Sequence, residues 1–78
     1  MLTLKIATPE KEIYNQETSK VIVKTLEGEI SIYPNHLPYL SIIKDGYVKL
    51  EDETIEIKSG SIILDDNNIV TILIENQA

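Results

Sequence analysis

The sequence predicts an all-β protein, a small antiparallel β-sandwich or flattened barrel of about 8–10 short strands. Three observations predict this fold class. Apolar residues alternate with polar ones along most of the chain, as they do in strands with one buried face. Turn-forming residues separate these runs at short intervals. No apolar residues keep the spacing of an amphipathic helix over three turns.

The alternating runs define the expected strands in order along the chain. In the first run, Leu2, Leu4 and Ile6 occupy every second position. The last run, 69–74, is nearly continuous in apolar residues, so we expect it to be buried on both faces or to cross between them. The clearest expected strands cover residues 2–6, 20–24, 29–32, 47–50, 54–58 and 69–74.

Polar or glycine-containing segments lie between these runs. Leu26-Glu27-Gly28 and Lys44-Asp45-Gly46 each supply a glycine where we expect a hairpin to reverse. Glu51-Asp52-Glu53 and Asp65-Asp66-Asn67-Asn68 are polar breaks that indicate turns. Ser59-Gly60-Ser61 interrupts an apolar stretch, and we expect a β-bulge or a close approach of two backbones there.

Length and charge limit the possible functions. The 78 residues predict a single domain, 1–78. Seven lysines, no arginine and 13 acidic residues give a net charge of −6, which repels nucleic acid and anionic lipid. No segment approaches the roughly 20 apolar residues that span a bilayer, and the amino terminus lacks the apolar region of a signal peptide. We therefore expect a cytosolic chain, soluble in isolation, with no nucleic-acid partner and no direct membrane insertion.

Candidate catalytic and metal-binding residues are few. His36 is the only histidine, and no cysteine or Gly-x-Ser-x-Gly motif supplies a nucleophile for it. The acidic segment 65–68 lacks the alternating ligands and central glycine of a calcium loop. No glycine-rich phosphate-binding motif is present. The residues therefore predict a binding module with no catalytic residue, no metal and no cofactor; a small hydrolase or metal enzyme built around His36 stays as an alternative.

Residues 27–40, EGEISIYPNHLPYL, resemble the hallmark segment of the epsilon subunit family of F-type ATP synthases. That family carries an E-G-E/D motif followed by P-G-H-A-P. Ile43-Lys44-Asp45-Gly46 is similar to the family's I-K-P-G turn, and residues 68–73 resemble its closing N-x-V-T-V-L strand. The resemblance covers essentially all 78 residues and implies the family's amino-terminal β-sandwich domain.

Two departures from the family pattern are informative. Asn35 stands where the family usually has glycine, and asparagine is the non-glycine residue that best tolerates a left-handed backbone. The sequence ends at Ala78, about where the family's carboxy-terminal helical hairpin begins. By resemblance, ATP sensing and inhibition of hydrolysis reside largely in that hairpin, so neither activity is expected here.

The resemblance implies a non-catalytic subunit at the foot of the central stalk of a proton- or sodium-driven ATP synthase. Such a subunit is a peripheral membrane protein on the cytoplasmic face of the inner (plasma) membrane. One of its surfaces is expected to bind the gamma subunit, and its loop end to contact the membrane rotor ring of c subunits. The residues that match the family's loop region, and are therefore expected at or near the rotor contact, are Glu29, Tyr33, Asn35, His36 and Ser41.

A second kind of binding module is also compatible with the residues. An unrelated acidic β-sandwich adaptor would bind a partner peptide by strand addition at an exposed sheet edge. It would show no specific affinity for gamma. Binding to gamma and the ring therefore separates the two hypotheses.

Overall fold

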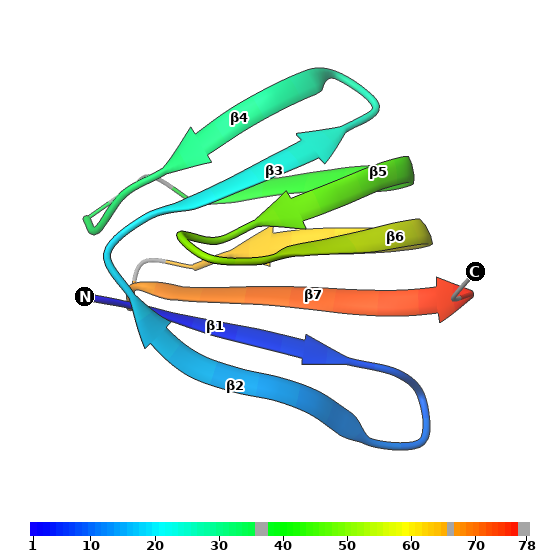
Figure 1. Ribbon diagram of the computed structural model, residues 1–78, viewed down its shortest axis with the longest axis horizontal. Helices are drawn as coiled ribbons and strands as arrows, with labels where there is room; N and C mark the ends of the chain where they lie inside the picture. The colour runs from blue at the N-terminus through cyan, green and yellow to red at the C-terminus, as the bar shows by residue number, and fades with distance from the viewer. Residues whose placement is uncertain (36–37, 66, 77–78) are drawn as a thin grey trace.

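The computed structural model describes residues 1–35, 38–65 and 67–76, which form seven β-strands and no helix. The strands make one mixed sheet in the order β2-β1-β7-β6-β5-β3-β4 (Figure 1). Their bounds are β1 Leu2–Ala7, β2 Glu12–Thr18, β3 Val21–Thr25, β4 Gly28–Ile32, β5 Tyr39–Lys49, β6 Thr54–Leu64 and β7 Ile69–Asn76. The predicted all-β class is confirmed.

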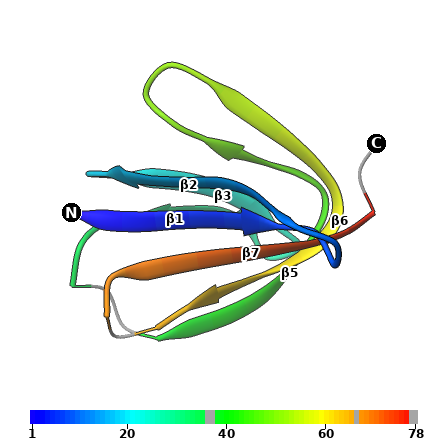
Figure 2. The same ribbon diagram turned by 90° about the horizontal axis from the view of Figure 1, so that it is seen from below.

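The long hairpin of β5 and β6 folds the sheet over itself. Its two strands pair in one register from Tyr39 opposite Leu64 to Lys49 opposite Thr54, except at Asp45. Only residues 47–49 of β5 pair with β3, and only residues 59–64 of β6 pair with β7. The hairpin therefore belongs to two layers: one contains β4 and β3, and the other contains β2, β1 and β7. Figure 2 shows the hairpin bending at one end of the molecule and returning along its other side.

The burial pattern changes register where the hairpin bends. In β6, Ile57 points into the core from an odd position, whereas Ile62 and Leu64 point inward from even positions. In β5, Ile43 is buried on one side of the bend and Val48 on the other. A bend that shifts the alternation by one residue moves every following side chain to the other face. Each strand thus supplies core residues to both layers, which is how sheet corners are built.

Two glycines permit this bend because other backbones lie against them. A Cβ atom added to Gly46 would lie 2.2 Å from the Lys24 carbonyl oxygen, and one added to Gly60 would lie 2.4 Å from the Leu73 carbonyl oxygen. The ladder between β6 and β7 also shifts register between Ser59 and Gly60. The predicted bulge and close backbone approach at Gly60 are therefore confirmed.

The prediction that Lys44-Asp45-Gly46 reverses a hairpin is wrong. These residues lie inside β5, and Asp45 takes a left-handed backbone with φ of 50° to bend the strand. Because β5 and β6 each run through their bend as 11 residues, the structure has seven strands where the sequence predicted about 8–10. Asp-Gly favours positive φ in a bend as readily as in a turn, so local sequence does not separate the two.

The other turns lie where the sequence predicted them. Leu26 and Glu27 connect β3 to β4, and Gly28 follows with φ of 118°. Residues 50–53 connect β5 to β6, and the Leu50 amide donates to the Glu53 carbonyl at 2.8 Å. Between β6 and β7, the Asp65 carboxylate accepts hydrogen bonds from the amides of Asn67 and Ile69. The turn interpretation of the acidic segment therefore holds for its described residues.

One strand pair departs from the predicted antiparallel arrangement. β1 pairs with β7 in parallel, from Thr3 opposite Ile69 to Ala7 opposite Leu73. The two strands are joined by no hairpin, so no tight turn forces them to be antiparallel. This pairing joins the first and last strands and makes the second layer continuous.

Among the described residues, the buried side chains of the core between the layers are aliphatic, apart from one threonine. Thr25 is buried, but its hydroxyl accepts from the Glu27 amide at 3.1 Å and donates to the Gly28 carbonyl at 3.2 Å. Tyr14 and Tyr39 pack at the margin of the core. The buried apolar residues are Leu2, Leu4, Ile6, Val21, Val23, Ile32, Ile43, Val48, Ile57, Ile62, Leu64, Val70, Ile72 and Ile74.

Gly60→Ala tests the bend. We expect this change to lower the free energy of unfolding by about 2–3 kcal/mol, the upper part of the range for overpacking, because the obstructing atom belongs to the β7 backbone. Urea denaturation measures the loss. Ser61→Ala is the matched control, since it removes an atom next to the bend and adds none. An equal effect of both changes would contradict the role of the close backbone approach.

Candidate functional site

The outward face of the second layer carries a group of exposed aliphatic side chains. Leu40 lies opposite Ile63 in the β5–β6 ladder, and Ser61 lies opposite both Ile42 and Leu73, so these side chains share one face. Leu40 is 71% exposed and Ile63 40%. Together with Leu26 from the β3–β4 turn, they form what we call the apolar outer surface: Leu26, Leu40, Ile42, Ile63 and Leu73.

The β3–β4 turn extends this surface across the free edge of β5. The Leu26 amide donates to the Ile42 carbonyl at 3.0 Å, which ties the turn of the first layer to a strand of the second. A hollow lies between the turn and the strand, lined by Leu26, Glu27, Leu40, Ser41, Ile42 and Ser61. Monomeric proteins rarely expose contiguous aliphatic patches without a use, so this face is the best candidate for an interface.

A carboxylate fixes the turn from its other side. Glu27 accepts a hydrogen bond from the Tyr39 hydroxyl and another from the Ser41 hydroxyl at 2.9 Å. Both hydroxyls reach the same carboxylate oxygen. These hydrogen bonds, first that of Tyr39 and then that of Ser41, hold the pKa of Glu27 below its ordinary value because they favour the charged form. Ser41, a predicted contact residue, thus has a partner within the chain.

Glu29 lies at the start of β4 with its side chain exposed. The Tyr47 hydroxyl donates a hydrogen bond to the Glu29 carboxylate. Lys24 of β3 lies between the two residues, because it pairs with Glu29 of β4 on one side and with Tyr47 of β5 on the other. The hydrogen bond to Glu29 raises the pKa of Tyr47, because it stabilises the protonated phenol beside a negative charge. The sequence offered no signal for Tyr47 as the partner, since the two residues are 18 positions apart.

Tyr33 and Asn35 lie at the opposite end of β4. The Lys20 ammonium lies 5.5 Å from the centre of the exposed Tyr33 ring, within the range of a cation–π contact. Asn35 takes a left-handed backbone with φ of 65°, and its amide donates to the Asn68 side chain at 2.5 Å. The expectation that asparagine replaces glycine here without loss of the loop's shape agrees with this geometry.

The predicted contact residues therefore do not form one compact site. The four residue steps from Glu29 to Tyr33 span about 13 Å of extended backbone. Ser41 lies in the other layer, and His36 lies outside the residues that the structure describes. Sequence reasoning missed the apolar outer surface, and it expected the β7 run to be buried on both faces or to cross between them. Leu73, in that run, is 42% exposed and belongs to this surface.

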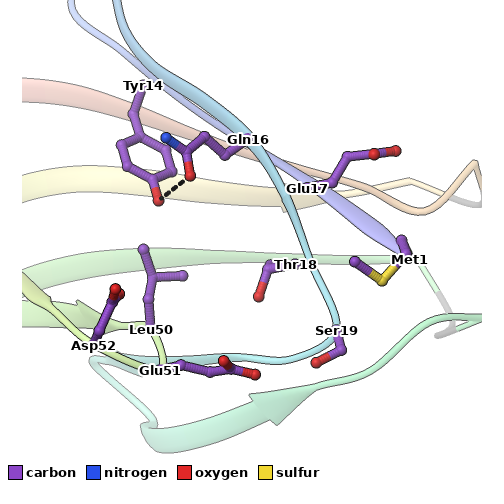
Figure 3. A pocket seen from close by; sticks show the side chains of 9 residues that line it. All are labelled: Met1, Tyr14, Gln16, Glu17, Thr18, Ser19, Leu50, Glu51 and Asp52. Atoms are coloured by element: carbon purple, nitrogen blue, oxygen red, sulfur yellow. Dashed lines mark hydrogen bonds between the residues drawn. The ribbon is translucent and has the colours of Figure 1, made fainter.

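A separate hollow lies between β2 and the turn that joins β5 to β6 (Figure 3). There the Tyr14 hydroxyl donates to the Gln16 side-chain oxygen at 3.4 Å. Partial burial, followed by the charge of Glu53, raises the pKa of Tyr14. None of the four predicted contact residues that the structure describes lines this hollow. Within the described ranges, no three histidine, cysteine or carboxylate side chains are grouped so as to hold a metal ion.

Comparison with known proteins assigns the chain. Residues 1–77 match the model of the β-sandwich domain of the ATP synthase delta/epsilon chain. The chain belongs to this family. An unrelated adaptor, the alternative left open by the residues, is thereby removed. The domain's name also agrees with the folded, two-layered sheet described above.

The relatives are epsilon chains. The epsilon chain of Ligilactobacillus salivarius is 39% identical over 74 residues, which cover 88% of this chain and 53% of that protein. The chloroplastic epsilon chain of Huperzia lucidula is 34% identical over 77 residues, covering 94% and 55%. This chain therefore spans about half the length of the curated relatives that it matches.

Solved structures share the fold. A chain in the central stalk and c-ring structure of the Tetrahymena thermophila mitochondrial ATP synthase matches with a TM-score of 0.76 at 19% identity, covering 96% of this chain and 63% of that one. A chain in the Euglena gracilis mitochondrial ATP synthase structure matches with a TM-score of 0.77 at 20% identity, covering 96% and 51%. In the part of this epsilon-type domain that the structure describes, no helix is long and apolar enough to cross a membrane.

The Glu27 hydrogen bonds predict a pH dependence of stability. A carboxyl group whose pKa is lowered by folding stabilises the folded state above its unfolded pKa, and this contribution is lost as the pH falls through the folded pKa. We therefore expect the free energy of unfolding of the natural chain to exceed that of Glu27→Gln near pH 7, and the difference to shrink under acid conditions. Urea denaturation at several pH values measures it.

Glu10→Gln is the control for this comparison, because it removes one exposed charge outside the turn. A difference between the natural chain and Glu27→Gln that stays constant from neutral to strongly acid pH would contradict the role of the charged carboxylate. The role would also be contradicted if Glu10→Gln changed the free energy of unfolding with the same pH dependence as Glu27→Gln.

Proposed function

We propose that this chain is a non-catalytic central-stalk subunit of an F-type ATP synthase, which binds the gamma subunit and the membrane rotor ring. In that position it helps to couple proton or sodium flow to ATP synthesis. It would lie on the cytoplasmic face of the membrane as a peripheral component of the complex. The observation that carries the proposal is the apolar outer surface, together with membership of the epsilon family.

The apolar outer surface has the properties of a protein interface. Its aliphatic side chains come from three adjacent strands and one turn, so a partner would contact a nearly flat sheet face. Removing such side chains from water on binding is favourable by about 25 cal/mol for each Å². These exposed side chains do not contribute to the packing of the core. We assign this surface to gamma, and the residues of the family's loop region to the ring.

The ring contact is proposed for the residues that match the family's loop region: Glu29, Tyr33, Asn35, His36 and Ser41. Glu29 and Tyr33 are exposed on β4 or immediately after it. The Glu29 carboxylate, already held by Tyr47, is available to a lysine or arginine of the ring. An exposed pair of this kind contributes less than about 1 kcal/mol, so it would set the register of the contact more than its strength.

The fold suits the transmission of torque. Neighbouring strands are joined by hydrogen-bonded ladders from β2 to β4, and the bent hairpin joins the two layers covalently. A body held by continuous ladders and a close-packed interior deforms little under load. Stiffness of this kind would let rotation of the ring reach gamma without local slippage.

Loss of the apolar outer surface should weaken gamma binding. We expect Leu40→Ser combined with Ile42→Ser to weaken the affinity for gamma at least about tenfold, because a few residues near the centre of an interface carry most of its binding energy. Isothermal titration calorimetry with purified gamma measures the change. Ile13→Ser on β2 is the matched control, an exposed isoleucine outside this surface. Equal affinities of the double variant and the natural chain would overturn the assignment.

Loss of the Glu29 charge should act on the ring contact. We expect Glu29→Gln to reduce the salt dependence of binding to the isolated c-ring, while the affinity changes by less than about fivefold. Glu56→Gln is the matched control, because Glu56 is also an exposed glutamate that lies beside Tyr47, in the neighbouring strand. If both variants keep the salt dependence of the natural chain, Glu29 is not a ring contact.

A further inference from the structure

We infer that Asn68 is a positioning residue, whose side chain holds the segment after β4, which carries Tyr33 and Asn35, against the turn between β6 and β7. Because Tyr33 and Asn35 are two of the residues proposed for the rotor contact, this role rests on the proposed function. Asn68 itself lies outside that set. In the sequence, it stands out only as the first residue of the segment that resembles the family's closing strand.

The backbone at Asn68 does not call for asparagine. Its φ is 60°, in the left-handed region, where glycine has the lowest conformational cost. Asparagine also adopts this region, at a higher cost than glycine. The Asn68 residue is half-buried, whereas Asn67, in the same turn, is exposed. An asparagine at position 68 is therefore explained better by its side chain than by its backbone.

The backbone of Asn68 is fixed in the second layer. Its carbonyl oxygen accepts a hydrogen bond from the Thr3 amide at 2.8 Å. The parallel ladder between β1 and β7 begins at the next position, where Thr3 lies opposite Ile69. The Ile69 amide also donates to the Asp65 carboxylate, at 3.3 Å. Asn68 is thus held between the turn and the first strand pair, which gives its side chain a firm base.

The side chain of Asn68 reaches a part of the chain that belongs to no strand. β4 ends at Ile32 and β5 begins at Tyr39, so Asn35 lies in the connection that leads from the first layer to the second. The end of β4, the β6–β7 turn and the start of β1 lie at the same end of the molecule in both Figure 1 and Figure 2. There the Asn35 amide donates to the Asn68 side-chain oxygen at 2.5 Å. One side chain therefore ties this connection to the second layer.

The same segment is attached to the first layer at Tyr33. The Lys20 ammonium, just before β3, lies 5.5 Å from the centre of the Tyr33 ring. Pro34, between Tyr33 and Asn35, has a restricted φ and limits the motion of the backbone. Tyr33 is 52% exposed and Asn35 is also exposed, so both can meet a partner while these contacts hold the backbone between them.

Fixing this segment in the free chain favours binding. Ordering a mobile side chain at an interface weakens binding by about two- to tenfold, and a preorganised segment avoids that loss. Asn68 needs no contact with the rotor to have this effect, because it acts through the backbone of Asn35. The property that matters is an acceptor oxygen on the side chain of residue 68.

Amide hydrogen exchange in the free chain tests the hydrogen bond. Asn68→Gly keeps the left-handed backbone and removes the acceptor, whereas Asn68→Asp keeps both. We expect the Asn35 amide to exchange about fivefold faster in Asn68→Gly, the factor that corresponds to one ordinary hydrogen bond, and no faster than in the natural chain in Asn68→Asp. The Thr3 amide should keep its natural rate in both variants, because its acceptor is the backbone carbonyl of residue 68.

Asn67→Gly is the matched control, since it removes an asparagine side chain from the same turn. It should leave the Asn35 amide at its natural rate. Equal acceleration of the Asn35 and Thr3 amides in Asn68→Gly would mean that the whole turn had loosened, and would overturn the role of the side chain. An unchanged Asn35 rate in that variant would overturn it as well.

Binding to the rotor then tests positioning. The probe is the purified complex of gamma with the c-ring, and surface plasmon resonance measures its affinity for each variant. We expect Asn68→Gly to weaken binding about fivefold, and Asn68→Asp to restore the natural affinity. Asn67→Asp controls for the added charge. If Asn68→Asp binds as weakly as Asn68→Gly while Asn67→Asp binds normally, the acceptor oxygen does not position the segment.

These outcomes separate the inference from the proposed function. If the natural chain does not bind the rotor complex, the proposed function fails, and the positioning role fails with it. If the natural chain binds and Asn68→Gly binds equally well although its Asn35 amide is released, the proposed function stands and only the positioning role is wrong.

Discussion

The structure depends on two close backbone approaches. The β3 backbone lies against Gly46 and the β7 backbone against Gly60, at distances that leave no room for a Cβ atom. These contacts let the β5–β6 hairpin bend without shifting the register of its ladder. Everything else in the fold follows from the bend: the two layers, the shared aliphatic core and the proximity of the β3–β4 turn to the free edge of β5.

The same bend produces the surface proposed for function. Because the inward face changes from odd to even positions along β6, Ile63 points outward although Ile57, also at an odd position, is buried. The outward side chains after the bend are aliphatic, and they join Leu73 from β7 in one face. In this chain the corner that closes the sandwich therefore also determines which apolar side chains remain for a partner.

Much of the fold could be predicted from residues close together in the sequence. The Leu26–Gly28 turn and the bulge at Gly60 were predicted because glycine has a local conformational meaning at each. The bend at Asp45 was taken for a hairpin, since the same dipeptide serves both. The parallel pairing of Thr3 with Ile69 was missed, because register between distant strands is set by the whole layer.

The candidate site was less predictable than the fold. The family pattern indicated Glu29, Tyr33, Asn35, His36 and Ser41, and the fold places Glu29 and Ser41 in different strands. The partners of Glu27 and Glu29 are 12 to 18 positions away in the sequence, so no local pattern could reveal them. Whether Leu40 or Tyr39 faces outward is likewise decided by the layer that β5 joins.

Solvent exposure of the isoleucine methyl groups tests the central claim most directly. In the NMR spectrum of the methyl-labelled chain, a soluble paramagnetic agent broadens exposed methyl signals and spares buried ones. The bend predicts that Ile57 and Ile62, which are 1% and 0% exposed, stay sharp, while Ile63, at 40%, is broadened. A straight β6 would keep one alternation throughout, so a sharp Ile63 signal with a broadened Ile62 signal would contradict the account.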